Sequence, residues 1–151
     1  MSGLFTLNTD FLILSFQALM LLAVVTWVFS TWLQDVSIVD YIWSLLTLLA
    51  VVTYSYSSSV SGSLGPVGIG MLLMVVIWGL RLAYFLMVRG HNKPEDRRYQ
   101  VIRKRNSPNF TFKSLYLIFI FQATVAWVMS VSFVPVFDMS MEQQNNWTFW
   151  H

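Results

Sequence analysis

The 151-residue chain is 56% hydrophobic and 17% aromatic, and only 11% of its residues are charged, against the roughly 25% usual in a soluble domain. Its formal net charge of +2 combines nine Lys and Arg residues, all between positions 81 and 113, with scattered acids. This composition excludes a soluble globular domain, and the absence of cysteine excludes disulfides, thiolate metal sites and thiol nucleophiles.

Four apolar stretches of the sequence are long enough to cross a bilayer, because a helix needs about 20 residues to span the hydrocarbon core. A tight turn at Gln34 and Asp35 separates the first two stretches, and a Ser/Gly-rich connection precedes the third. The sequence therefore predicts an all-α integral membrane four-helix bundle that occupies residues 1–151 as a single membrane domain. The predicted spans are residues 11–33, 36–56, 66–88 and 114–137.

A basic hydrophilic loop, residues 89–113, lies between the third and fourth spans. Within it, residues 95–105 are predicted to form a short interfacial helix. Pro94 suits a first helical turn, while Glu95 and Asp96 suit the positive end of the helix dipole. The positive-inside rule predicts that this loop is cytoplasmic and that both termini lie on the opposite side of the membrane.

Three of the predicted helices place a polar residue in the same leaflet. Counted from the cytoplasmic ends, Asp40 lies about 6 Å deep, Arg81 about 12 Å and Gln122 about 13 Å. An Arg in a span costs about 2.5 to 3.5 kcal/mol on insertion scales, so Arg81 either snorkels to the headgroups or is neutralised by Asp40 or an anionic ligand. The second alternative predicts that Asp40 and Arg81 face one another in a polar pocket, with Gln122 nearby.

Two tryptophans lie on the same helix faces as these charges, Trp43 three residues after Asp40 and Trp78 three before Arg81. Such faces could line a flat apolar substrate, although Trp is also ordinary near a membrane interface. The candidate substrate-pocket residues are Asp40, Trp43, Trp78, Arg81 and Gln122.

The charged side chains of the basic loop are candidates for contacts with phosphate. Arg guanidinium groups bind phosphate oxygens bidentately, and simple attraction to anionic lipid headgroups is the alternative. Nucleic acid is not an expected partner, because acids interrupt the basic run and no stacking platform accompanies it. No metal site is expected, since His91 has no second ligating histidine nearby. The candidates for cofactor-phosphate or loop contacts are Glu95, Asp96, Arg97, Arg98, Tyr99 and Arg103.

Four short motifs, taken in order, resemble the amino-terminal half of DUF1295 membrane proteins, which are relatives of the steroid 5-alpha-reductases. They are VDYIW at 39–43, WGLRL at 78–82, EDRRY at 95–99 after Arg89, and FIFQ at 119–122. The resemblance implies a multi-pass protein of the bacterial cytoplasmic membrane or the endoplasmic reticulum. It also implies reduction of a carbon–carbon double bond conjugated to a carbonyl, with hydride from NADPH. The wider superfamily includes methyltransferases that act on prenylcysteine or lipid substrates, and a fold does not distinguish these chemistries.

The sequence also departs from that family. Such proteins continue into a second half that carries an Arg-His-Pro-Asn-Tyr type motif associated with cofactor binding, and this sequence has no equivalent. The resemblance therefore predicts half of a larger multi-span fold, which we expect to bind NADPH weakly on its own.

Two functions remain open from the sequence. The first is the amino-terminal portion of a membrane-embedded NADPH-dependent reductase, acting on an apolar lipid or steroid-like enone and completed by a complementary carboxy-terminal chain. The second is a small non-enzymatic four-span membrane protein with a structural or assembly role. The lipid bilayer is a partner in both.

Overall fold

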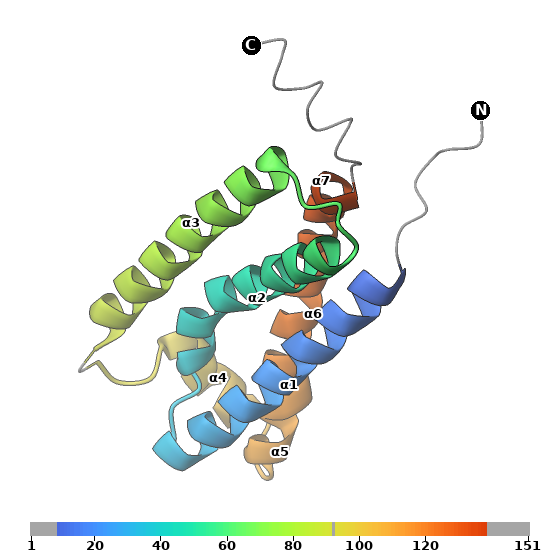
Figure 1. The fold of residues 1–151 in the computed structure, drawn as a ribbon. Helices are drawn as coiled ribbons and strands as arrows, with labels where there is room; N and C mark the ends of the chain where they lie inside the picture. Colours follow the sequence, from blue (N-terminus) through green and yellow to red (C-terminus); the bar gives the residue numbers. More distant parts are fainter. Residues whose placement is uncertain (1–8, 92, 139–151) are drawn as a thin grey trace.

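A computed structural model describes residues 9–91 and 93–138, and within these ranges the chain is all-helical (Figure 1). Three long helices come first, and the short helix α4 follows them. A last helical rod begins with α5, continues through a π-helical stretch at Leu115–Ile120 into α6, and reaches α7 through a 3₁₀ turn at Val131–Phe133. The helices are α1 (Thr9–Leu33), α2 (Ile38–Val60), α3 (Pro66–Gly90), α4 (Arg97–Arg105), α5 (Phe110–Ser114), α6 (Phe121–Ser130) and α7 (Val134–Asp138).

Four helical segments are long and apolar enough to cross a membrane, which confirms the predicted all-α four-span class. The chain is a multi-pass membrane protein. The fourth helical segment begins at Phe110, before the predicted start of the span at residue 114, and it includes Lys113, whose ammonium donates to the Asn106 carbonyl at 3.1 Å. The segments are Leu12–Leu33, Ile38–Val60, Pro66–Gly90 and Phe110–Phe137.

The second helix, α2, is the centre of the bundle and contacts α1, α3 and α6. Ala50, Val51 and Tyr54 on this helix are fully buried. Its approach to α3 is close at Gly79, whose carbonyl accepts a 3.0 Å hydrogen bond from the Ser44 hydroxyl. A side chain at Gly79 would begin only 3.4 Å from the β-carbon of Leu48, so a small residue allows this close approach of α2 and α3.

A buried hydroxyl network links α1, α2 and the last rod inside the apolar region. The Tyr54 hydroxyl lies 2.9 Å from the Ser130 hydroxyl and accepts from Ser15 at 3.3 Å. The Trp127 indole donates to Ser15 at 3.2 Å. Polar atoms in hydrocarbon need protein partners, and this network supplies them across three helices.

The two ends of the bundle differ in their chemistry. Helices α4 and α5 lie at one end, together with the basic loop, whereas α7 and the α2–α3 connection lie at the other (Figure 1). Helix α3 is the span that the rest of the described protein covers least. In an 18-residue apolar stretch of α3, 17% of the residues are buried, against 44% in the corresponding stretch of α2. Much of α3 therefore faces lipid or further protein, while its two ends reach the polar loop and α7.

Candidate functional site

The carboxylate of Asp40, in the first turn of α2, joins that helix to α4. Arg98 donates from Nη2 to Oδ2 of Asp40 at 2.9 Å, and the Tyr99 hydroxyl donates to Oδ1 at 2.6 Å. The side chain of Asp40 is 28% exposed and that of Arg98 68%, whereas Tyr99 is buried. The ion pair therefore lies at the surface and contributes modestly, while the buried Tyr99 hydroxyl depends on Asp40 for its partner.

Asp96 begins α4 and fixes the position of Arg98. Its Oδ1 accepts from the Arg98 backbone N–H at 2.9 Å, an N-cap bond, and from Arg98 Nε at 3.1 Å. Its own backbone N–H donates to the Ser37 hydroxyl at 2.8 Å, directly before α2. The start of α4 is thus bonded to the start of α2 twice: through the Asp96 backbone N–H, and through the Arg98 side chain that Asp96 holds in place.

Glu95 forms a second connection, to the turn between α1 and α2. Arg103 donates to its two carboxylate oxygens at 2.7 and 3.1 Å, and the Val36 backbone N–H donates to Oε1 at 3.0 Å. The Arg103 guanidinium also lies over the Phe110 ring, 4.6 Å from its centroid. This carboxylate is only 13% exposed, and its three hydrogen bonds join the α1–α2 turn to α4. The Arg103 guanidinium extends the connection to the start of the last rod.

These contacts shift the ionisation of the loop groups. Burial, and then the hydrogen bond to Asp40, raise the pKa of Tyr99 above its ordinary value, because both favour the neutral phenol. The side-chain hydrogen bonds from Arg98 lower the pKa of Asp96, and the same bonds raise the pKa of Arg98. The charged forms of the Asp96–Arg98 pair are therefore favoured in the folded state.

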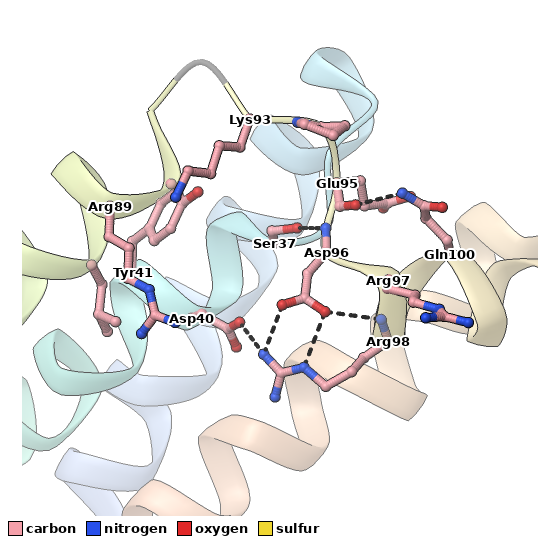
Figure 2. Close-up of a pocket in the computed structure, with 13 residues that line it drawn as sticks. Ser37, Asp40, Tyr41, Arg89, Lys93, Glu95, Asp96, Arg97, Arg98 and Gln100 are labelled. Carbon is pink, nitrogen blue, oxygen red and sulfur yellow. Dashed lines mark hydrogen bonds and ion pairs between the residues drawn. The ribbon is translucent and has the colours of Figure 1, made fainter.

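A cavity of about 520 Å³ lies at this end of the bundle, and we call it the loop-end cavity. The side chain of Arg89, in the last turn of α3, and that of Lys93, in the connection from α3 to α4, reach toward it near Asp40 and Tyr41 (Figure 2). Neither side chain forms an ion pair or hydrogen bond within the described ranges 9–91 and 93–138, although the charge of Arg89 helps to lower the pKa of Asp96. Cations without such bonds in an open cavity are suited to binding an anion such as phosphate. Its lining residues are Ser37, Asp40, Tyr41, Leu86, Arg89, Gly90, Lys93, Pro94, Glu95, Asp96, Arg97, Arg98 and Gln100.

A second cavity, of about 440 Å³, lies between α2, α3 and the region where α6 meets α7; we call it the apolar cavity. Its lining is aromatic and thioether-rich, and Trp78, Met74 and Met129 on its wall are 44%, 61% and 53% exposed. Because these exposed side chains belong to spans, the cavity opens toward the lipid. The lining residues are Trp43, Thr47, Met71, Met74, Val75, Trp78, Met129, Ser132 and Phe133.

The predicted substrate-pocket residues do not gather in one place. Asp40 lines the loop-end cavity, and Trp43 and Trp78 line the apolar cavity. The predicted pairing of Asp40 with Arg81 is wrong, since Asp40 bonds Arg98 and Tyr99 and Arg81 is exposed on α3. Gln122 lines neither cavity and makes no side-chain hydrogen bond to another described residue, so the expected cluster with Asp40 and Arg81 does not form.

The loop candidates divide into bound and free side chains. Glu95, Asp96, Arg98, Tyr99 and Arg103 bond other parts of the chain, as described above. Arg97 forms no side-chain ion pair within the described part of the chain, and it points away from Arg89 and Lys93 (Figure 2).

Sequence reasoning missed several residues of the two cavities. Ser37 and Tyr41 flank Asp40, and their proximity to the VDYIW motif was the one available signal. Arg89 and Lys93 were seen only as part of the basic loop. Thr47 carried no signal at all, because a threonine among apolar residues is ordinary in a membrane helix.

The fold defines the chain as a multi-pass helical membrane protein, with a polar cavity at one end and an apolar cavity between its spans. The model of one family, described as "Protein of unknown function (DUF1295)", matches residues 26–151. The chain belongs to this DUF1295 family. Comparison with curated proteins and with solved structures gives no match.

Proposed function

We propose that this chain forms the substrate-binding part of a membrane-embedded reductase, which uses NADPH to reduce a lipid or steroid-like enone. The observation that carries the proposal is the apolar cavity, because its volume of about 440 Å³ lies within the range of pockets that hold small molecules. Its wall offers two indole rings, from Trp43 and Trp78, and flexible thioethers that adapt to an apolar ligand. A substrate dissolved in the bilayer could enter between the spans without crossing water.

The loop-end cavity supports a place for the anionic part of the cofactor. Arg89 and Lys93 fit phosphate oxygens, and NADPH, when bound, would supply the hydride. Asp40 lines this cavity and Trp43, one helical turn further along α2, lines the apolar cavity. A reductase must bring cofactor and substrate together, and the shared helix supports assigning both cavities to one site.

We expect NADPH to bind this chain weakly. The guanidinium groups of Arg98 and Arg103 already bind carboxylates of the same chain, so they are not free for phosphate. Among the described residues that line the loop-end cavity, the three cations without such bonds, Arg89, Lys93 and Arg97, do not face one point (Figure 2). Tight cofactor binding would need groups from a further polypeptide.

The second candidate function is a non-enzymatic membrane protein with a structural or assembly role. One observation favours it: most charged residues of the EDRRY motif hold α4 against α2 and the α1–α2 turn. A motif that stabilises the fold in this way is also expected in a membrane protein that catalyses no reaction.

Ligand binding by the chain in lipid nanodiscs distinguishes the two functions. We expect saturable binding of a steroid enone, and about a tenfold loss of affinity in Trp78→Ala, which removes a large aromatic contact. Trp32→Ala is the matched control, since Trp32 is 78% exposed on α1 and does not line the cavity. Binding that is absent, or equally weakened by both substitutions, would contradict the substrate cavity.

NADPH is then added to the same nanodiscs, and nicotinamide fluorescence is followed. We expect no saturation at concentrations that saturate ordinary NADPH enzymes, with weak binding that Arg89→Ala reduces further. Tight NADPH binding together with enone-dependent oxidation by this chain alone would contradict the need for further groups.

A further inference from the structure

We propose that Thr47 is the hydrogen-bonding anchor of the apolar cavity, and that the ligand held there presents a carbonyl oxygen to its hydroxyl. This inference rests on the proposed function, since it concerns the same cavity, and it adds the residue that orients the ligand. It also assigns the carbonyl of the proposed enone substrate to one defined point of the cavity.

The hydroxyl of Thr47 is in an unusual state. The residue is 6% exposed and lines the apolar cavity, and its Oγ1 is the one buried side-chain nitrogen or oxygen within residues 9–91 and 93–138 that has no hydrogen-bond partner. A threonine hydroxyl in a helix ordinarily donates to the carbonyl three or four residues earlier. Thr26 and Thr53 do so at 2.7 Å each. Buried polar atoms are costly when unpaired, so the absence of a partner at a cavity wall points to a ligand atom.

The rest of the cavity wall directs a polar ligand group to Thr47. Most of the lining side chains are apolar, and the second hydroxyl, on Ser132, already donates to the Met129 carbonyl at 2.8 Å. A threonine hydroxyl offers one donor and two acceptor lone pairs, and its donor fits the ketone oxygen that the proposed enone substrate carries. The Thr47 oxygen is shielded in this structure, so the proposal requires a rotation about χ1 to the other of the two rotamers that a helical threonine adopts.

Thr47 is a positioning residue, since it holds the ligand and exchanges no proton or electrons with it. A carbonyl fixed at Thr47 would place the rest of the molecule against Trp43 and Trp78, whose rings line the same cavity. A hydrogen bond of this kind in an apolar setting favours a ketone over its hydrocarbon counterpart by about three- to thirtyfold.

The experiment compares a steroid ketone with the steroid hydrocarbon of the same ring skeleton, binding to the full chain in nanodiscs. Empty nanodiscs supply the background for partition into lipid. We expect the wild type to prefer the ketone by about three- to thirtyfold, and Thr47→Val, which replaces the hydroxyl by a methyl group of similar shape, to bind both equally. Thr47→Ser keeps a hydroxyl and should keep a ketone preference.

The free energy of unfolding distinguishes the proposed role of Thr47 from a purely structural one. Thr47→Val should be as stable as the wild type or more so, because it removes an unpaired buried hydroxyl. Thr26→Val is the matched control: that hydroxyl bonds the Leu22 carbonyl away from the cavity, so its loss should lower stability and leave the ketone preference unchanged.

The outcomes separate this inference from the proposed function. Equal binding of ketone and hydrocarbon by the wild type would overturn the role of Thr47 and leave the substrate cavity standing. A ketone preference that survives in Thr47→Val, or a Thr47→Val chain that unfolds more readily than the wild type, would also overturn it. Failure of both steroids to bind saturably would overturn the cavity itself and the anchor with it.

Discussion

The two cavities of this protein border the same helix but are built in opposite ways. Around the loop-end cavity, Asp40, Glu95 and Asp96 each bond a cation or a backbone N–H, and the motif residues are largely committed to one another. Around the apolar cavity, one buried hydroxyl has no partner and the remaining lining offers mainly dispersion contacts. The carboxylates of the first region are therefore paired within the chain, whereas the second region keeps a buried hydroxyl without a partner.

This difference separates residues that maintain the fold from residues that would recognise a molecule. Charged motifs attract attention in a membrane sequence, yet here they connect α4 to α2 and to the α1–α2 turn. The cavity suited to an apolar ligand has no comparable motif, because indole rings and thioethers are common throughout a membrane helix. Substitutions of the paired residues in the first region should change stability, whereas those in the second region should change binding.

The largest effect is expected at Glu95. Glu95→Ala removes three hydrogen bonds from a nearly buried carboxylate and leaves the Arg103 guanidinium and the Val36 N–H without their partner. Loss of a hydrogen-bonded charge of this kind should cost about 2 to 3 kcal/mol of unfolding free energy. Denaturant titration in detergent, followed by circular dichroism, measures the change.

Glu95→Gln is the matched control for that prediction. The amide oxygen can still accept from Val36, but the ion pair with Arg103 is lost, so we expect an intermediate loss of stability. A Glu95→Ala chain as stable as the wild type would show that the charged cluster does not hold the fold together, and the contrast between the two cavities would disappear.

A smaller effect, with a pH dependence, is expected at Tyr99. Tyr99→Phe removes the 2.6 Å bond to Asp40 and should cost about 1 kcal/mol near neutral pH. The pKa of Tyr99 is raised by burial and by the hydrogen bond to Asp40, so its contribution to stability is complete below the ordinary phenol pKa of about 10 and is lost as pH rises toward the higher folded value.

Thermal unfolding of both chains from about pH 8 to about pH 11 tests this dependence. The wild type should lose more of its unfolding temperature than Tyr99→Phe above about pH 10, so the two curves should converge. Curves that stay parallel across this range would show that the Tyr99 hydroxyl does not contribute as described.

The spans were predictable because they depend on a property that the sequence shows directly. Long runs without charge locate the helices, and Gln34, Asp35 and the Ser/Gly segment mark the turns between them. The helical segment that contains the predicted fourth span begins earlier, at Phe110, and the contact there between Lys113 and the Asn106 carbonyl depends on how the loop folds.

The site was less predictable, because it depends on which distant residues meet. Asp40 was correctly placed near the polar end of α2, but its partner Arg98 comes from a loop that folds back, 58 residues later in the chain. The unpaired hydroxyl of Thr47 could not be predicted, because it depends on how the side chain packs. Thr26 and Thr53 also lie among apolar residues of the sequence, yet both are paired in the structure.

The smallest effect is expected at Arg81, the residue that the sequence paired with Asp40. Arg81 is exposed on α3 and forms no ion pair within the described ranges, so Arg81→Leu should change the free energy of unfolding by less than about 0.5 kcal/mol. Arg103→Leu is the contrasting variant, since its guanidinium binds Glu95 bidentately and lies over Phe110, and its loss should resemble that of Glu95→Ala. Denaturant titration of both variants in the same detergent gives the comparison. Equal losses of unfolding free energy in the two variants would mean that Arg81 has a partner in the folded membrane protein. The contrast between the bonded side chains of the loop end and the unpaired Arg81 on α3 would then be wrong.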